Sequence, residues 1–485
     1  MAEPLLLRDA RLVGSGPDPV DVLLRDGIIT EIGAVVKVSG VRPVALDGRW
    51  LLSGLWDEHV HFTQWALMRQ RLDISAATGA AHAAAMVRDH LAGAAAADHP
   101  LVGYGFRDGL WTDAPSREQL DAAAGARAVV LVSADLHSVW LNTAASVRFG
   151  VAAIDDVLRE DAAFAVTRQL DEVPDALADR WAAEAAAAAA RGVVGIVDLE
   201  MAWNATVWAR RVAGGLRNLR VDAGIYPTEL DRALREGLRT GDAVPGGDDL
   251  IRVGPFKILI DGSLNTRTAC CRDRDADGAN GWLTVSPDAL LGLLRRAVAG
   301  GLVPAVHAIG DEAVRIALDT FAVLGSGGRM EHAQLVADAD LPRFAALGVT
   351  ASMQPEHAMD DRDVADRYWA DRTGRAFPVG ALWRAGATLA LGSDAPVSPL
   401  DPWRGIAAAV SRSRDGLPPW HPEQTIPVAA ALAASTRGRL IVPGAPADLV
   451  VLEQDPLTAS PAQLRSMPVA ATVLRGAVTA GTLPG

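Results

Sequence analysis

Cysteine is nearly absent from this chain. Its 485 residues include two cysteines, and these are neighbours, Cys270 and Cys271. Two adjacent thiols cannot supply a disulfide framework for a protein of this size, which fits a reducing cytoplasm. The first ten residues also lack the charged-then-apolar pattern of a signal peptide, so we expect a cytoplasmic protein.

Excess positive charge and long apolar runs are missing as well. The chain has 46 basic and 59 acidic residues and a net charge of −13. Nucleic-acid phosphates require a basic face, and a membrane surface attracts Lys/Arg runs, so we expect neither partner. No apolar stretch reaches the ~18 residues of a transmembrane helix. A small-molecule substrate remains as the expected partner, and a homodimer is left open.

Half of the residues are hydrophobic, so the chain can build a large core. From Gly54 onward, short apolar segments alternate with alanine-rich helical segments, which predicts parallel strands joined by crossover helices. The first candidate strand ends at His59 and His61. The others span residues 129–133, 193–198, 220–225, 255–260, 303–307, 329–332, 349–353 and 388–394.

These nine candidates are one more than an eight-stranded α/β barrel holds. Residues 129–133 lie in the long interval between His61 and Val193, which is too long for one crossover. We therefore assign them to an insertion, at roughly residues 70–190, that has helices of its own. The prediction is a (β/α)8 TIM barrel over residues 53–435.

The two chain ends have the character of a β domain. Asp26-Gly27 separates two apolar runs and is a hairpin signal, because the turn requires positive φ. Residues 447–452 and 469–476 also read as strands. Each end is too short for its own core. Residues 1–52 and 436–485 are therefore expected to form one small β domain.

The first candidate strand ends in His59-Val60-His61. Residues i and i+2 of a strand share one face, so the two imidazoles point the same way and offer two nitrogens to a metal ion. Alone, a His-x-His pair is more often one solvated and one hydrogen-bonded histidine, so further ligands are needed.

Further polar residues lie at the ends of other candidate strands, where the active sites of α/β barrels are built. Each is a weak signal alone, since a strand-end histidine is often structural and a Gly-Ser-Asp turn is often a loop cap. Together with the histidine pair they make five signals in order along the chain, and the additional ones are Lys257, His307, His332 and Asp394. Lys257 stands among apolar residues, where a lysine is costly unless its charge is paired or removed.

The chain resembles the amidohydrolase superfamily of metal-dependent hydrolases. The resemblance is to the amidohydrolase-3 branch, which contains YtcJ-like proteins and N-substituted formamide deformylase. Four stretches carry it, and they are KILIDGSLNTRTA at 257–269, DLHSVWLNTA at 135–144, GSDAPVSPLDP at 392–402 and PGAPADLVVL at 443–452. Asn265-Thr266 departs from the small residues more common in that branch, which bears on substrate choice.

The resemblance implies a barrel, a β-sandwich from both termini and an insertion after the first strand. It also implies one or two divalent ions, with Zn²⁺ expected first and Mn²⁺ or Fe²⁺ as alternatives. By position, His59, His61 and Asp394 would hold one ion and His307 and His332 the other, bridged by a CO2-derived carbamate on Lys257. The alternative is a plain Lys257 paired with Asp394 or Asp261 beside one ion.

Such a site implies hydrolysis of a C–N bond in an amide, cyclic amide or N-formyl amine. A metal activates water and polarises a carbonyl, and Asp394 would move the proton from water to the leaving amine. An ester or lactone hydrolase with the same site, and a non-catalytic metal-binding protein that kept the fold, are the alternatives. All six ligand positions are filled, which counts against the last of these.

Four residues outside the ligand set are candidates for substrate binding. His137 would reach over the barrel mouth from the insertion, or else be a surface or capping histidine. Arg267 would bind a substrate oxygen or pair with a nearby acid such as Asp273. His357 follows the seventh barrel strand, and Trp111 would line an apolar pocket.

Overall fold

The computed structural model describes residues 3–16, 18–93, 99–151, 156–170, 172–188 and 191–483. Its central element is an eight-stranded sheet in which every neighbouring pair is parallel. In sheet order the strands are β6 (Leu55–Val60), β12 (Val193–Asp198), β13 (Arg220–Ile225), β14 (Ile251–Leu259), β15 (Pro304–Ala308), β16 (Gly328–His332), β17 (Val349–Met353) and β18 (Leu389–Leu391).

The last strand of this sheet returns beside the first. Val60 forms a parallel bridge with Ala395, and the N–H of Asp394 donates to the carbonyl oxygen of His59 at 2.7 Å. The sheet is thus a nearly closed barrel, and the predicted eight-stranded parallel architecture is confirmed.

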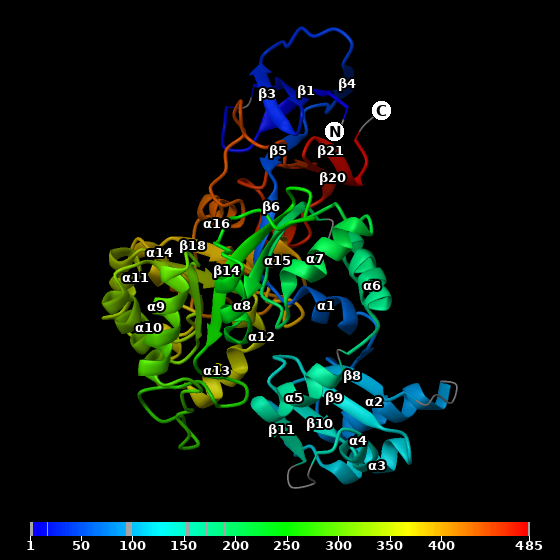
Figure 1. The fold of residues 1–485 in the computed structure, drawn as a ribbon, viewed down its shortest axis with the longest axis vertical. Coiled ribbons are helices and arrows are strands. Elements are labelled where there is room, and N and C mark those ends of the chain that lie inside the picture. Colours follow the sequence, from blue (N-terminus) through cyan, green and yellow to red (C-terminus); the bar gives the residue numbers. More distant parts are fainter. Residues whose placement is uncertain are drawn as a thin grey trace.

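Helices connect the strands and cover the outside of the barrel (Figure 1). Local signals fix their ends, as in α9, where the side chain of Ser286 accepts from the N–H of Ala289 and Pro287 opens the helix. The helices of this part are α1 (Phe62–Met68), α6 (Asp175–Ala188), α7 (Asn204–Ala213), α8 (Leu230–Arg235), α9 (Pro287–Ala299), α10 (Asp311–Leu324), α11 (Leu341–Leu347), α12 (His357–Asp360), α13 (Arg362–Tyr368), α14 (Val379–Arg384), α15 (Pro402–Ser411), α16 (Val428–Ser435) and α17 (Pro461–Arg465).

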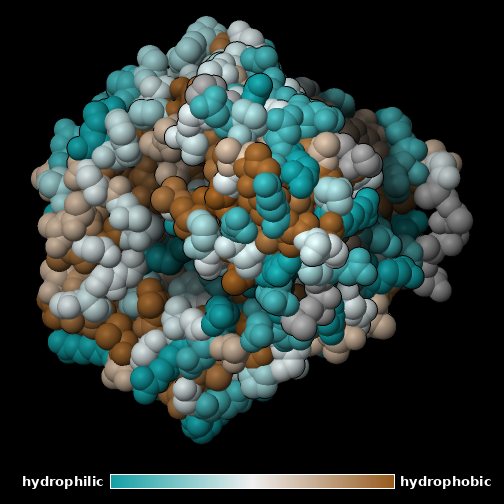
Figure 2. Space-filling view, turned by 90° about the horizontal axis from the view of Figure 1, so that it is seen from above, coloured by the Kyte–Doolittle hydropathy of each residue, from teal (hydrophilic) through white to brown (hydrophobic). Residues whose placement is uncertain are grey.

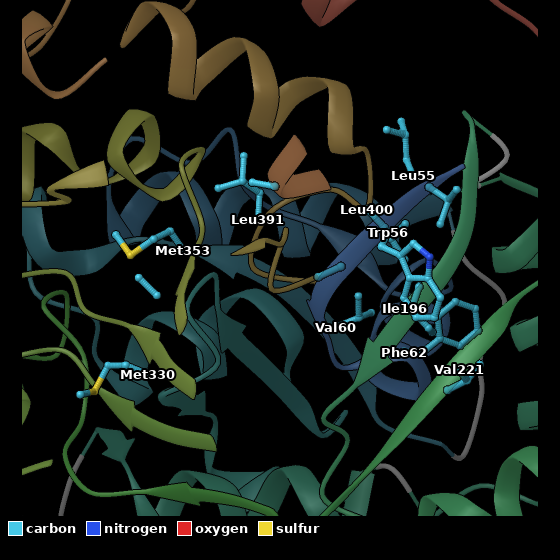
Figure 3. Packing of buried hydrophobic residues seen from close by; sticks show 14 of the residues in the cluster. Leu55, Trp56, Val60, Phe62, Ile196, Val221, Met330, Met353, Leu391 and Leu400 are labelled. Atoms are coloured by element: carbon cyan, nitrogen blue, oxygen red, sulfur yellow. The ribbon is translucent and has the colours of Figure 1, made fainter. Parts of the chain in front are cut away.

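The largest buried hydrophobic cluster joins the barrel strands to these helices (Figure 3). Trp56 of β6, Ile196 of β12 and Val221 of β13 are buried with Phe62 of α1. Burial of such side chains stabilises the fold by roughly 25 cal/mol per Å² of apolar surface. Gly54 precedes β6, and a Cβ there would lie 2.3 Å from the side chain of Val194, so only glycine fits this approach.

The two chain ends meet in one mostly antiparallel sheet beside the barrel, and the N and C termini lie close together in Figure 1. Asp26 and Gly27 have positive φ, as the predicted hairpin requires. Pairing of β1 with β5 joins all eight strands in one hydrogen-bonded sheet, so the shared β domain is present and the sandwich layout is confirmed only in part. In sheet order they are β21 (Ala477–Gly481), β20 (Val469–Leu474), β19 (Leu449–Leu452), β5 (Trp50–Ser53), β1 (Leu5–Leu12), β2 (Val20–Arg25) and β3 (Ile28–Gly33), with β4 (Arg42–Ala45) on β1.

The insertion after α1 contains the third sheet of the described structure, which has five strands, besides the expected helices, and it lies below the barrel in Figure 1. Residues 129–133 form its β9, so leaving them out of the barrel was correct. The sheet runs β11 (Val157–Arg159), β10 (Ser138–Leu141), β9 (Val129–Ser133), β8 (Leu101–Phe106) and β7 (Leu72–Asp73), with helices α2 (Ala80–Gly93), α3 (Arg117–Ala124), α4 (Thr143–Arg148) and α5 (Asp161–Leu170).

Figure 2 views the molecule from the end that carries the terminal sheet, and on this face small groups of hydrophobic residues lie among hydrophilic ones. Within the described ranges, no helix combines the length and the apolar character needed to cross a membrane.

Candidate metal centre

The six predicted metal ligands lie at the carboxyl end of the barrel strands. His59 belongs to β6 and His61 follows it directly, Lys257 lies on β14, and His307 lies on β15. His332 is the last residue of β16, and Asp394 follows β18. The alternation of strands and helices therefore brings together side chains that are up to 335 positions apart, from His59 to Asp394.

Asp394 stands between the histidines. Its Oδ1 lies 3.3 Å from Nε2 of His59 and 3.4 Å from Nε2 of His61, and its Oδ2 lies 4.0 Å from Nδ1 of His332. The ring centroids of His307 and His332 are 4.5 Å apart. His59, His332 and Asp394 each offer one ligand atom within 4.8 Å of the others.

The backbone is shaped to aim these side chains. Asp394 and His332 adopt the left-handed conformation, with φ of 57° and 73°, which costs a non-glycine residue about 1–2 kcal/mol. Gly392 lets the chain after β18 approach β6, because a Cβ there would lie 2.6 Å from the backbone nitrogen of His59. The close approach at the barrel seam thus places Asp394 beside both histidines of β6.

The electrostatics of the cluster place the neutral imidazoles of His59, His307 and His332 beside an anion, while that anion, Asp394, outweighs burial at His61 and raises its pKa. Burial, followed by the charge of Lys257, lowers the pKa of His59 to about 4. Burial also lowers the pKa of His307 and His332 well below the usual range. For Asp394 burial alone would raise the pKa, but His59 and His61 outweigh it and lower the pKa, so the carboxylate is ionised at neutral pH.

The residues fit a divalent cation. In the cluster and in His357, five buried ring or carboxylate atoms have no hydrogen-bond partner in the described structure, and they are Nδ1 of His61, Nε2 of His307, Nδ1 of His332, Nε2 of His357 and Oδ1 of Asp394. Buried polar atoms are rarely left unpaired, and neutral imidazole with carboxylate is a donor set that binds Zn²⁺ and its neighbours. A cation held among these residues would give a partner to those of the unpaired atoms that face it.

Lys257 is buried against the same cluster, with Nζ 3.4 Å from Nε2 of His59. Burial lowers its pKa to about 8, although Glu331 and Asp394 act in the opposite direction. Among the described residues, no ion pair within 4 Å joins Lys257 to Asp394 or Asp261. Asp261 instead accepts from the backbone N–H groups of Ile309, Gly310 and Cys270.

His137 is held inside the mouth of the barrel by the insertion. Its Nδ1 donates to Oε2 of Glu160 at 2.8 Å, and its ring centroid lies 6.2 Å from that of His307. Burial would lower the pKa of His137, but Glu160 outweighs it and raises the pKa to about 9. The surface-histidine alternative is therefore wrong. The hydroxyl of Thr266 donates a hydrogen bond to Oε1 of Glu160. Thr266 is one of the two residues at which the sequence departs from the amidohydrolase-3 branch.

Comparison with known proteins places this site in a family. The sequence model described as "Amidohydrolase family" matches residues 42–480, which is most of the chain. The chain belongs to the amidohydrolase family. The resemblance noted in the four sequence stretches is thereby confirmed.

Individual relatives agree with this assignment. The chain is 26% identical over 512 residues to the putative amidohydrolase YtcJ of Bacillus subtilis, and the match covers 94% of this chain and 95% of that protein. It is 27% identical over 249 residues to N-substituted formamide deformylase of Arthrobacter pascens, covering 47% and 45%. A crystal structure of an uncharacterized metal-dependent hydrolase from Pyrococcus horikoshii shares the fold, with a TM-score of 0.77, 22% identity and coverage of 95% and 99%.

The cluster opens into a cavity of about 310 Å³. The barrel forms its floor, and the insertion forms one wall through the β9–β10 loop and α5. Beyond the histidines, the cavity is lined from α5, α6, α7 and the loops beside them by both apolar and charged residues. The apolar ones are Phe164, Val173, Ala178, Met201, Ala202 and Val207, and the charged ones are Arg168, Glu172, Asp175, Arg210 and Arg211.

Several cavity residues were not singled out from the sequence. Tyr226 directly follows β13, Glu200 lies two residues after β12, and Gln334 lies two residues after β16. A search of the first two positions after every barrel strand would have found all three. His357, which was singled out, lines the cavity with Nε2 3.9 Å from Oδ2 of Asp394.

Two substrate-binding candidates lie elsewhere. Trp111 and Arg267 line a separate depression of about 420 Å³, which Asn265 shares with the main cavity. Trp111 packs against Phe106, with ring centroids 5.9 Å apart. Arg267 pairs with Asp277 at 2.9 Å rather than with Asp273. Neither side chain faces the histidine cluster, so we no longer place them in the substrate site.

Proposed function

We propose that the protein is a metal-dependent hydrolase that cleaves a C–N bond in an amide, cyclic amide or N-formyl amine. The observation that carries the proposal is the placement of the Asp394 carboxylate, 3.3 and 3.4 Å from Nε2 of His59 and His61, among buried atoms without hydrogen-bond partners. A bound divalent ion supplies an acidified water and a polarised carbonyl.

Asp394 moves the proton in this mechanism. Its carboxylate is ionised at neutral pH, so it accepts a proton from the water as the water attacks the carbonyl carbon. The same carboxyl group then donates that proton to the leaving nitrogen, which departs as a neutral amine. The nitrogen is a poor leaving group unless it is protonated before the C–N bond breaks. The reaction therefore requires a residue that accepts a proton from water and then donates it to the nitrogen.

Asp394 and the other polar residues of the cluster would hold the ions, and further polar residues would orient the substrate. His59, His61 and Asp394 are proposed for one ion and His307 and His332 for a second, with Lys257 as a bridging carbamate. An unpaired lysine buried among these groups is costly, and a carbamate replaces its positive charge with an anion that suits two cations. His137 and His357 face the cavity and are proposed to bind substrate polar atoms.

The apolar part of the cavity lining supports a substrate with an apolar substituent. Phe164, Met201 and Val207 belong to this lining, so an amide with an alkyl or aryl group would bury that group against them. The relative from Arthrobacter pascens is named for N-substituted formamides. This agrees with a C–N bond between a small acyl group and a larger apolar amine.

Matched chromogenic substrates test the bond class. We expect release of 4-nitroaniline from 4-nitroformanilide or 4-nitroacetanilide, with a catalytic preference for these anilides over 4-nitrophenyl acetate after correction for the uncatalysed rates. Hydrolysis of the ester alone would assign the site to ester or lactone chemistry. Metal binding without turnover of amides, cyclic amides or esters would favour the non-catalytic alternative.

Replacement of Lys257 by alanine is expected to lower the metal content. If a carbamate on Lys257 bridges two ions, the wild-type protein holds two ions per chain and Lys257→Ala holds fewer. A short carboxylic acid added in CO2-free buffer should partly restore the second ion. Metal analysis per chain measures both effects, and Lys37→Ala in the terminal domain is the control. One ion per wild-type chain with a bare amine at Lys257 would refute the bridge while leaving the hydrolase proposal intact.

A further inference from the structure

A series of ion pairs between two buried glutamates and two partly exposed arginines leads to His59. Glu331 of β16 is fully buried, and its Oε2 accepts from Nδ1 of His59 at 2.8 Å. Its Oε1 accepts from Nε of Arg329 at 2.9 Å. Glu331 and His332 are consecutive, and neighbouring residues of a strand normally face opposite sides. The left-handed backbone at His332 ends that alternation, so both side chains reach the same cluster.

Arg329 is fixed in turn by Glu58. Its Nη1 donates to Oε2 of Glu58 at 2.8 Å, and its Nη2 donates to the carbonyl oxygen of Glu58 at 2.8 Å. The series of ion pairs continues to Arg437, which follows α16. Arg437 contacts Glu58 and also pairs with Asp222 at 2.8 Å. Each carboxylate thus meets a guanidinium, and these charge-assisted hydrogen bonds offset the cost of removing the charges from water.

The Glu331 contact determines which nitrogen of His59 carries the hydrogen. A carboxylate can only accept hydrogen bonds, so Nδ1 must be the protonated nitrogen of a neutral His59. The lone pair then lies on Nε2. That nitrogen is the one 3.3 Å from Oδ1 of Asp394 and 3.4 Å from Nζ of Lys257.

We infer that Glu331, held by Arg329 and Glu58, is a positioning residue that fixes His59 with Nε2 as its metal-binding nitrogen. The inference rests on the proposed metal site and adds a residue that does not itself touch metal or substrate. Carboxylates that hold ligating histidines in this way affect metal affinity by about 10–100-fold.

The test is metal affinity in Glu331→Gln. A glutamine amide can donate to Nδ1, which moves the hydrogen of His59 to Nε2 and removes the lone pair that a metal needs. We expect the dissociation constant for Zn²⁺, measured by competition with a chromophoric chelator, to rise about 10–100-fold. Glu331→Asp keeps the acceptor and the charge and should recover part of the affinity. Glu312→Gln is the matched control, since Glu312 also binds an arginine, Arg315, but on α10 away from the site.

Three outcomes separate the explanations. Unchanged Zn²⁺ affinity in Glu331→Gln would overturn the inference. Equal losses in the Gln and Asp variants, together with a lower melting temperature of both metal-free proteins, would assign Glu331 to fold stability and overturn it as well. A wild-type protein that binds no Zn²⁺ would instead refute the metal site on which the proposed function depends, whatever the variants do.

Discussion

Removal of divalent metal is expected to abolish hydrolysis. His59, His307 and His332 are buried and neutral, so without an ion they can neither polarise a carbonyl strongly nor acidify water. An ion supplies several kcal/mol of transition-state stabilisation, and each 1.36 kcal/mol is a factor of ten in rate. We therefore expect a loss of about 10³-fold or more.

The experiment is prolonged dialysis against a chelator, followed by metal analysis and assay with the anilide substrates. Zn²⁺ or Mn²⁺ added back should restore the rate, and dialysis against the chelator already saturated with Zn²⁺ should leave it unchanged. Circular dichroism before and after dialysis separates loss of metal from loss of fold. Full activity in a sample verified to be metal-free would exclude a metal-dependent reaction.

Asp394→Asn is expected to lower kcat by about 10²–10⁴-fold, the usual cost of losing a general base. The substitution keeps the shape of the side chain and one oxygen for a metal ion but removes the group that takes the proton. The pKa of Asp394 is held below its usual range by His59 and His61, so the wild-type base is ionised over the neutral range. The acidic limb of the pH–rate profile should therefore change in the variant.

Metal content and kcat of the Asp394 variant are measured together, so that a lost base is distinguished from a lost ligand. Asp363→Asn, at an exposed position on α13, is the control for the same chemical change. A variant with full metal occupancy and wild-type kcat would remove the proton-transfer role from Asp394, and His137 would be the next residue to examine.

The sequence predicted the barrel and its ligand-bearing ends because both depend on local patterns. Strand–helix alternation specifies a parallel sheet, and a polar residue after an apolar strand can be located without knowing what it contacts. His59, His307, His332 and Asp394 are brought together for this reason. The hairpin turn at Asp26-Gly27 is an equally local signal, because it depends on positive φ at two adjacent residues.

Other features depend on distant contacts that no local pattern encodes. The sheet of the insertion includes β7, with two residues, and β11, with three, and such short strands are specified by their partners rather than by periodicity. The bond between Glu331 and His59 joins residues 272 positions apart. Trp111 and Arg267 were misplaced because the direction of a loop side chain is determined by tertiary packing.

Anomalous diffraction from crystals of the metal-loaded protein tests the central claim most directly. Data collected on both sides of the zinc absorption edge locate each bound ion without reference to activity. The account predicts a peak among His59, His61 and Asp394, with a second beside His307 and His332. Peaks confined to other parts of the molecule, with none at this cluster in a protein whose zinc content is verified, would contradict it.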